Sequence, residues 1–98
     1  MKYLENEDFK EEVKEGKVLV DFYADWCGPC KMLGEVIEEV SQEMDIKILK
    51  VNVDKHEDLA RKFGVMSIPY IVLYENGEAK RSNLGFMMKE DLKKFIEE

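Results

Sequence analysis

The chain has 98 residues, of which 45% are apolar and 38% are charged, and its formal net charge is −7 at pH 7. This length and apolar content suit a single domain, residues 1–98, with a modest core. The acidic balance, with basic residues dispersed among glutamates, argues against nucleic acid as a partner. No run of about 18 apolar residues occurs, so we expect neither a membrane span nor an export signal, and no membrane partner.

The predicted elements in the first half alternate between strands and helices. A short strand near residues 2–4 precedes a helix that Asn6 can cap and that runs to about Glu15. The apolar run at 18–24 predicts a buried strand, and apolar residues then recur at helical spacing over about 29–43.

The second half continues the alternation. Its elements are a strand at 46–53, a helix ending at Gly64, two strands at 70–74 and 78–84, and a helix at about 89–97. Asp54 can cap the first of these helices, in whose first turn we expect a solvated His56. Asn76-Gly77 is the strongest short hairpin signal. Met88 precedes the last helix and offers its first N–H groups no acceptor.

Helices between strands imply parallel crossovers, and the closing hairpin adds an antiparallel edge. The sequence therefore predicts an α/β protein whose mixed sheet is covered on both faces. In open sheets of this kind, ligand chemistry usually lies at the carboxyl ends of the strands, which here includes the end of the strand at 18–24.

Both cysteines of the chain, Cys27 and Cys30, lie where that strand turns into a helix. They are one helical turn apart, close enough to form a small disulfide ring. A helix N-terminus favours a thiolate at Cys27, whereas Cys30 continues the apolar stripe of the helix. Pro29 fits the first turn, where its missing N–H costs nothing. We expect one accessible, easily ionised sulfur and one shielded sulfur.

Two other interpretations of the cysteine pair are inert buried thiols and half of a zinc site. A structural zinc site usually needs about four Cys or His ligands, and His56 is the only further one in the chain. Redox chemistry without a metal is therefore favoured. Two cysteines within one turn cannot cross-link distant segments, unlike the frameworks of secreted proteins, so we expect a reducing, cytoplasmic setting.

Asp21 stands in the middle of the apolar strand at 18–24. An unpaired buried carboxylate is costly, so we expect this residue to have a role. Burial and a nearby thiolate should both raise its pKa. An ion pair with Lys50 on the neighbouring strand is the alternative interpretation, and the two can coexist.

Residues 20–32, V-D-F-Y-A-D-W-C-G-P-C-K-M, resemble the active-site segment of the thioredoxin family. The resemblance continues at 50–54, 63–65, 67–69, 76–77 and Gly85, and so covers nearly the whole chain. It implies the thioredoxin fold, with a central mixed five-stranded sheet in the order 1-3-2-4-5 flanked by four helices.

The resemblance also implies a function, that of a protein disulfide reductase which carries two electrons by dithiol–disulfide exchange. Cys27 would attack a target disulfide, Cys30 would resolve the mixed disulfide, and Asp21 with Lys50 would assist proton transfer to and from Cys30. No bound cofactor is implied. The expected partners are a thioredoxin reductase and disulfide-containing target proteins, and the expected state is a monomer.

In the family, a cis proline faces the disulfide and the backbone before it pairs with an extended substrate segment. Ile68–Pro69 matches that position, and Tyr70 replaces the usual Thr after it. The implied contact residues are Trp26, Gly28, Pro29, Met66, Ser67, Ile68, Pro69, Gly85 and Phe86. Met87 and Met88 extend this apolar set in our hypothesis. Tyr23 stands where many members carry a second Trp.

Two alternative functions stay open from the sequence. An oxidase or isomerase of the same fold often carries His between its cysteines, whereas Gly28-Pro29 favours reduction. A thioredoxin-fold binding subunit with incidental thiols would be inactive in an insulin reduction assay.

Overall fold

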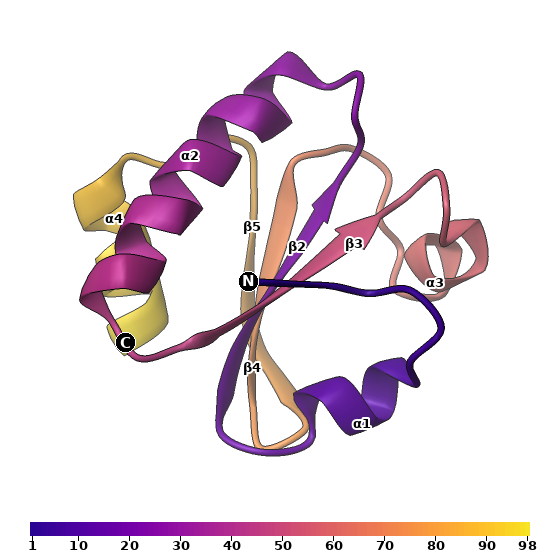
Figure 1. Cartoon of the computed structure of the whole chain (residues 1–98), viewed down its shortest axis with the longest axis horizontal. Coiled ribbons are helices and arrows are strands. Elements are labelled where there is room, and N and C mark those ends of the chain that lie inside the picture. The colour runs from indigo at the N-terminus through magenta and orange to yellow at the C-terminus, as the bar shows by residue number, and fades with distance from the viewer.

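A computed structural model describes residues 1–98 and shows strands and helices in the predicted alternation (Figure 1). The elements are β1 (Lys2–Tyr3), α1 (Phe9–Val13), β2 (Lys17–Tyr23), α2 (Gly28–Glu43), β3 (Lys47–Asn52), α3 (Glu57–Lys62), β4 (Tyr70–Glu75), β5 (Glu78–Leu84) and α4 (Lys89–Glu97). The strands form one sheet in the order β1-β3-β2-β4-β5. β2 is parallel to β3 and antiparallel to β4, so the predicted mixed sheet and its strand order are confirmed.

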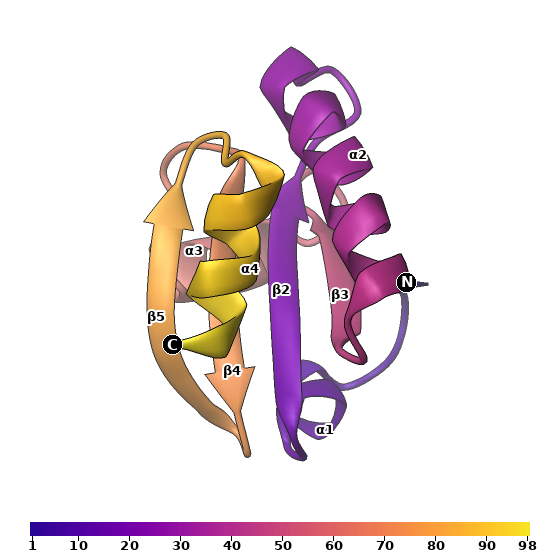
Figure 2. The same cartoon turned by 90° about the vertical axis from the view of Figure 1, so that its left-hand side faces the viewer.

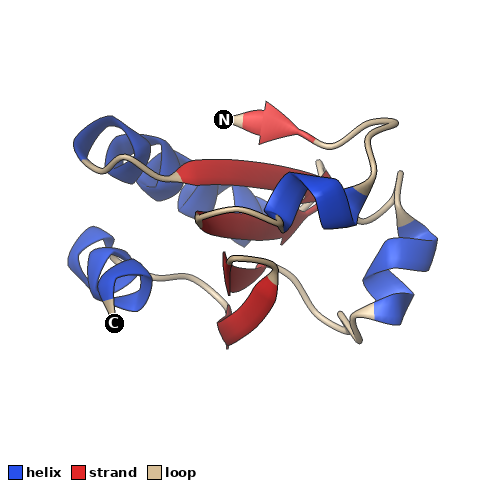
Figure 3. Ribbon diagram, turned by 90° about the horizontal axis from the view of Figure 1, so that it is seen from below, coloured by secondary structure: helices blue, strands red, loops and turns tan.

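The helices cover both faces of this sheet, with α2 and α4 on one side and α1 and α3 on the other (Figures 2 and 3). Side chains alternate along β2, so Val20 and Phe22 point into the core under α1 and α3, whereas Leu19 points into the core under α2 and α4. Each helix therefore buries one apolar face against the sheet. No helix is both long and apolar enough to cross a membrane.

The β4–β5 hairpin turns at Asn76-Gly77, as predicted. Both residues have positive φ, 50° and 86°, which is the conformation that favours Asn and Gly in a two-residue hairpin. The Asn76 side chain accepts a hydrogen bond from the Gly16 N–H at 2.9 Å. Gly77 donates its N–H to the Val13 carbonyl at 3.0 Å, so the turn also fixes the end of α1.

The predicted start and end of the first helix are wrong. α1 begins at Phe9 and ends at Val13, with Asp8 rather than Asn6 as its N-cap. The Asp8 side chain accepts from the Lys10 N–H, and the two terminal residues of the helix, Phe9 and Val13, are the ones it buries. The helix is about one and a half turns long. It ends at Val13 because the residues that follow do not face the core and so add no packing that would stabilise a longer helix.

The predicted cap of the helix after β3 is also wrong. Asp54 lies before α3 in a turn where the Asn52 side chain accepts from the Asp54 and Lys55 N–H groups at 2.8 and 3.3 Å. His56 is the N-cap residue of α3 and makes no side-chain cap. The Asn52 side chain satisfies the backbone of this turn, so the helix starts later than the pattern predicted.

His56 is half-buried rather than solvated. Its Nε2–H donates to the Leu4 carbonyl at 2.8 Å, because a carbonyl oxygen can only accept. This hydrogen bond joins the start of α3 to the segment that follows β1, two parts of the chain that are distant in sequence.

The start of α4 lacks a side-chain cap, as the sequence indicated. Met88 is the N-cap residue with extended backbone, φ −71° and ψ 158°, and its side chain accepts no hydrogen bond. The helix is held instead by its apolar face, which buries Leu92, Phe95 and Ile96. The first N–H groups of α4 therefore have no side-chain acceptor at the cap position.

Met88→Ser is expected to raise the free energy of unfolding by about 1 kcal/mol, because the backbone already has the N-cap conformation and only the acceptor is missing. Urea denaturation of the oxidised protein measures the change. Met66→Ser is the matched control, since it removes an exposed methionine from a loop without providing a cap. An equal gain in both variants would show that removing an apolar surface side chain, not capping, stabilises the protein.

Candidate active site

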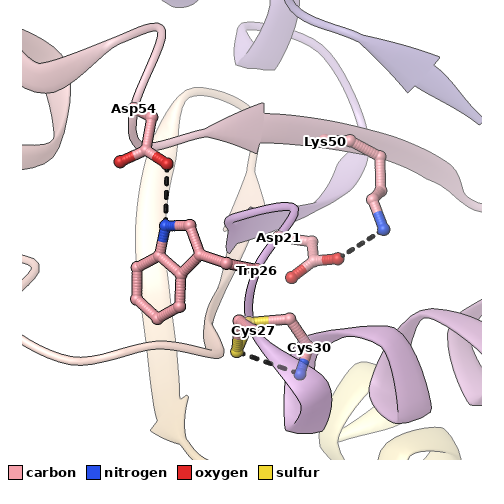
Figure 4. Close-up of a disulfide and its surroundings, with 6 residues drawn as sticks. All are labelled: Asp21, Trp26, Cys27, Cys30, Lys50 and Asp54. Carbon is pink, nitrogen blue, oxygen red and sulfur yellow. Dashed lines mark hydrogen bonds and ion pairs between the residues drawn. A yellow bond between two sulfur atoms is a disulfide. The ribbon is translucent and has the colours of Figure 1, made fainter.

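The two cysteines form a disulfide at the junction of β2 and α2 (Figure 4). Their Cα atoms are 5.2 Å apart, which is in the usual range for a disulfide. Cys27 is the N-cap residue of α2, and its Sγ accepts a hydrogen bond from the Cys30 N–H at 3.1 Å. Pro29 lies in the first turn as predicted. The sulfur of Cys27 thus takes the place that a capping oxygen occupies in other helices.

The first turn of α2 carries no acidic residue, whereas each of the other helices carries two. The pairs are Glu11 and Glu12 in α1, Glu57 and Asp58 in α3, and Glu90 and Asp91 in α4. Carboxylates at a helix N-terminus partly neutralise its positive end. In α2 that positive end acts on the Cys27 sulfur alone, which favours negative charge there.

The expected difference in exposure between the two cysteines is wrong for this oxidised state. Cys27 is 5% exposed and Cys30 is 3% exposed. Both pack with Ala24, and Ile68 from the loop before β4 packs against them. The sequence pattern covered only the strand and helix that carry the pair, and so it could not account for a covering loop from elsewhere in the chain.

Asp21 lies next to Lys50 because the parallel register of β2 and β3 pairs the two residues. Lys50 Nζ is 2.9 Å from Asp21 Oδ2 (Figure 4). Neither carboxylate oxygen has a partner in hydrogen-bonding geometry. Burial raises the pKa of Asp21, and the Lys50 charge opposes this only in part. The expected ion pair and the expected upward shift therefore both exist at one residue.

A cleft of about 270 Å³ reaches both Lys50, the cation of the ion pair, and the inner cysteine. Cys30, Lys50 and Gly34 all line it, and a Cβ atom on Gly34 would lie 3.4 Å from Lys50 Nζ. The sequence did not single out Gly34, whose position in a helix gives no signal of this contact. A larger cleft of about 550 Å³ lies between α1 and α3 on the other face and includes neither cysteine.

The loop before β4 holds the proline that the sequence singled out. The Ile68–Pro69 bond is cis, and Pro69 is buried. The Pro69 carbonyl accepts from the Gly85 N–H at 2.8 Å. Gly85 has φ +100°, which other residues rarely adopt. This hydrogen bond brings the loops before β4 and after β5 together, next to Ile68 and the disulfide.

Large apolar side chains on these two loops and on the segment between β2 and α2 are exposed. Trp26 is 71% exposed, Met66 94% and Phe86 41%. Other predicted contact residues, Gly28, Pro29 and Ser67, are exposed as well, and Ile68 is half-buried. Met88 is exposed, but Met87 is half-buried against the core under α2 and α4, so it does not belong to the exposed set.

Trp26 is held by Asp54, which the sequence predicted to be a helix cap. Its indole N–H donates to Asp54 Oδ2 at 2.9 Å (Figure 4). Asp54 follows β3, the strand that is parallel to β2, so its carboxylate lies at the same sheet edge as the segment after β2. The rule that carboxyl ends of parallel strands meet could have indicated this contact.

Comparisons with known proteins agree with this geometry. A sequence model of the Thioredoxin family matches residues 1–98. The chain is 45% identical to thioredoxin of Bacillus subtilis over 93 residues, which cover 93% of this chain and 89% of that one. It is 46% identical to thioredoxin of Rickettsia felis over 92 residues, which cover 90% and 88%.

Solved structures show the same likeness. A point mutant of thioredoxin from Halobacterium salinarum superposes with a TM-score of 0.89 at 37% identity, covering 97% of this chain and 86% of that one. A chain from a structural study of thiol resolution in yeast mitochondrial 1-Cys peroxiredoxin via glutathione/thioredoxin systems superposes with a TM-score of 0.90 at 31% identity, covering 99% and 93%.

Asp21→Asn is expected to change stability in a pH-dependent way. A carboxyl group whose pKa is raised by folding stabilises the fold below its unfolded pKa, and this contribution is lost as pH rises through the folded pKa. The unfolding free energy of the variant relative to wild type should therefore increase from pH 5 to pH 8, by about 1.4 kcal/mol for each unit by which the folded pKa lies above 5.

Chemical denaturation of the oxidised proteins at both pH values measures this difference. The pH dependence identifies the dominant interaction, because Asn removes both the buried charge and the partner of Lys50. A variant that is less stable than wild type by the same amount at pH 5 and pH 8 would show that attraction to Lys50 exceeds the cost of burying the Asp21 charge, since the folded pKa would then lie below the unfolded pKa and outside this pH range.

Proposed function

The chain belongs to the thioredoxin family and is a protein disulfide reductase, and we propose that it passes electron pairs from a thioredoxin reductase to disulfide-containing target proteins. The observation that carries the proposal is the position of Cys27 Sγ at the N-terminus of α2, where it accepts the Cys30 N–H. A sulfur in that position is stabilised as a thiolate, which is the nucleophile in disulfide exchange.

In the first step of the proposed mechanism, the Cys27 thiolate attacks one sulfur of the target disulfide. A Cys27–target disulfide forms, the target disulfide breaks, and its second sulfur leaves as a thiolate. The buried position of Cys27 in the oxidised state does not oppose this step, because the attack starts from the reduced pair.

In the second step, Cys30 gives its proton to Asp21, and its sulfur attacks the Cys27 sulfur of the mixed disulfide. The Cys27–Cys30 disulfide forms and the remaining target sulfur leaves, so the target gains two electrons. Asp21 is suited to accept the proton because it is buried, has a raised pKa and has only the Lys50 ammonium as a neighbouring donor. When Asp21 becomes neutral, the positive charge of Lys50 balances the negative charge on the Cys30 sulfur. Lys50 and Cys30 line the same cleft.

The target binds across the loops that carry the exposed apolar residues. The backbone at Ser67 and Ile68 pairs with an extended target segment, beside cis-Pro69 and Gly85. Trp26, Met66 and Phe86 supply apolar contact area, and the exposed Gly28 and Pro29 lie at this surface between the two cysteines. Met88 lies at the border of this surface, three residues after Gly85.

The protein works as a monomer in the cytoplasm. A monomer leaves the apolar surface around Trp26 open to targets of different shape. The two cysteines form a single short-range pair whose reduction a cytoplasmic environment sustains. A thioredoxin reductase returns the two electrons after each cycle.

Cys30→Ser is expected to trap a mixed disulfide between Cys27 and an insulin chain, because attack proceeds and resolution fails. Intact-mass spectrometry under non-reducing conditions measures the adduct. Cys27→Ser is the matched control and should form no adduct and reduce no insulin. If iodoacetamide modified Cys30 before Cys27 in the reduced protein near pH 7, the assignment of the nucleophile would be wrong.

Met66→Ser and Met88→Ser are expected to raise the KM for insulin reduction about threefold or more and to change kcat little, since they remove apolar contact area outside the reacting atoms. Dithiothreitol as electron source makes the assay independent of the reductase. Unfolding cannot explain a loss in Met88→Ser, because that variant is expected to be more stable. An unchanged KM in both variants would limit these methionines to packing.

A further inference from the structure

Two tyrosine rings lie against the Lys50 ammonium. The ammonium is 4.7 Å from the centroid of the Tyr23 ring and 6.0 Å from that of Tyr3. The two rings meet edge to face, with their centroids 6.2 Å apart. A cation over the face of an aromatic ring is attracted by the electrons of that face. Lys50 is therefore bound by the rings as well as by the Asp21 carboxylate.

Strand register fixes this arrangement. Tyr3 pairs with Lys50 between β1 and β3, and Lys50 pairs with Asp21 between β3 and β2. The three residues form a row across the sheet. Tyr23 is two residues after Asp21, so its side chain lies on the same face of β2. The rings are thus held beside the ion pair by the sheet and not by flexible loops.

The helix above the sheet encloses the remaining side of the ammonium. A Cβ atom on Gly34 would lie 3.4 Å from Lys50 Nζ, so α2 passes within contact distance of the ammonium at this glycine. The cleft of about 270 Å³ opens at this point, and Tyr3 and Tyr23 form part of its wall.

We propose that Tyr23, assisted by Tyr3, is a positioning residue whose ring holds the Lys50 ammonium against Asp21 and thereby controls how readily Asp21 accepts a proton. The inference deepens the proposed function, because it assigns regulation of the proton acceptor for Cys30 to two tyrosines that take no part in the disulfide exchange. Tyr23 also packs against the cluster of Ala24, Cys27 and Cys30, so the test includes a measurement that a packing role would not change. Tyr23 is the main contributor, since its ring is nearer to the ammonium than that of Tyr3.

The sign of the effect follows from the charges. Burial raises the pKa of Asp21, and the Lys50 charge lowers it. Without the Tyr23 ring, the ammonium can move away from the carboxylate into the cleft, and the lowering effect weakens. The other ionisable groups that face this cleft are the α-amino group of Met1, the phenol of Tyr3, Asp25 after β2, and Cys30, Lys31, Glu35 and Glu38 on α2. These groups are the same in all variants below, except that Tyr3→Leu removes the Tyr3 phenol.

The experiment compares Tyr23→Leu, which removes the ring, with Tyr23→Phe, which keeps the ring and removes the hydroxyl. Carbon-13 NMR follows the titration of the Asp21 carboxyl in the oxidised full-length protein. We expect the pKa of Asp21 to rise in Tyr23→Leu and to stay at the wild-type value in Tyr23→Phe. Tyr3→Leu should give a smaller rise. Tyr23→Met replaces Tyr23→Leu if the latter fails to fold.

The rate of insulin reduction provides a second measurement. In Tyr23→Leu, the pH dependence of the resolving step should move to higher pH, and the rate at pH 7 should fall by about three- to tenfold. Tyr23→Phe should keep the wild-type profile. A loss of rate with an unchanged pH profile would indicate a merely structural role for Tyr23 and would overturn the proposal.

Lys50→Met provides the decisive background. If Tyr23 acts through Lys50, then adding Tyr23→Leu to Lys50→Met should not change the pKa of Asp21 further. An equal rise in both backgrounds, or a fall in Tyr23→Leu alone because water reaches the carboxylate, would overturn the proposal. The titration requires no target protein, so it tests the role of Tyr23 independently of insulin reduction. A wild-type protein that reduced no insulin would refute the proposed function and would leave the titration result valid.

Discussion

The pairing of β2 with neighbours on both sides is the constraint on which the rest of the structure depends. β2 lies between β3 and β4, and the register sets Asp21 opposite Lys50 on one side and Ile71 on the other. A carboxylate in that position cannot reach bulk water, so its only charged partner is the one that the register provides. The same pairing brings the end of β2, and with it the start of α2, to the sheet edge where β3 ends and β4 begins.

The surroundings of the Cys27 sulfur favour its ionised form, whereas those of the Asp21 carboxyl disfavour its ionised form. The Cys27 sulfur receives an N–H at the start of a helix whose first turn has no acidic residue, which favours negative charge. Asp21 is buried, which disfavours negative charge and raises its pKa, and Lys50 opposes this shift only in part. Groups whose ionisation is shifted apart in this way suit the nucleophile and the proton acceptor of one reaction.

Specific hydrogen bonds hold the loops around the disulfide, in addition to the packing of Ile68 and the burial of Pro69. Trp26 is mostly exposed but is fixed by its hydrogen bond to Asp54. The loop at Pro69 is joined to Gly85 by one backbone hydrogen bond. Apolar side chains can therefore remain exposed for partners while the backbone that presents them is ordered, which lowers the entropic cost of binding.

The sequence by itself determined the alternation of strands and helices, the Asn76-Gly77 turn, the uncapped start of α4 and the cysteine pair at a strand–helix junction, because each depends on residues within one turn or one strand. Only the tertiary structure decided the partners of Asp54 and His56, which are Trp26 and Leu4, 28 and 52 residues away. It also decided the burial of Cys27 under Ile68 and the contact of Tyr3 with Lys50. Local patterns predict where a side chain points, but the group that it meets depends on strand order and register, which join residues that no local pattern connects.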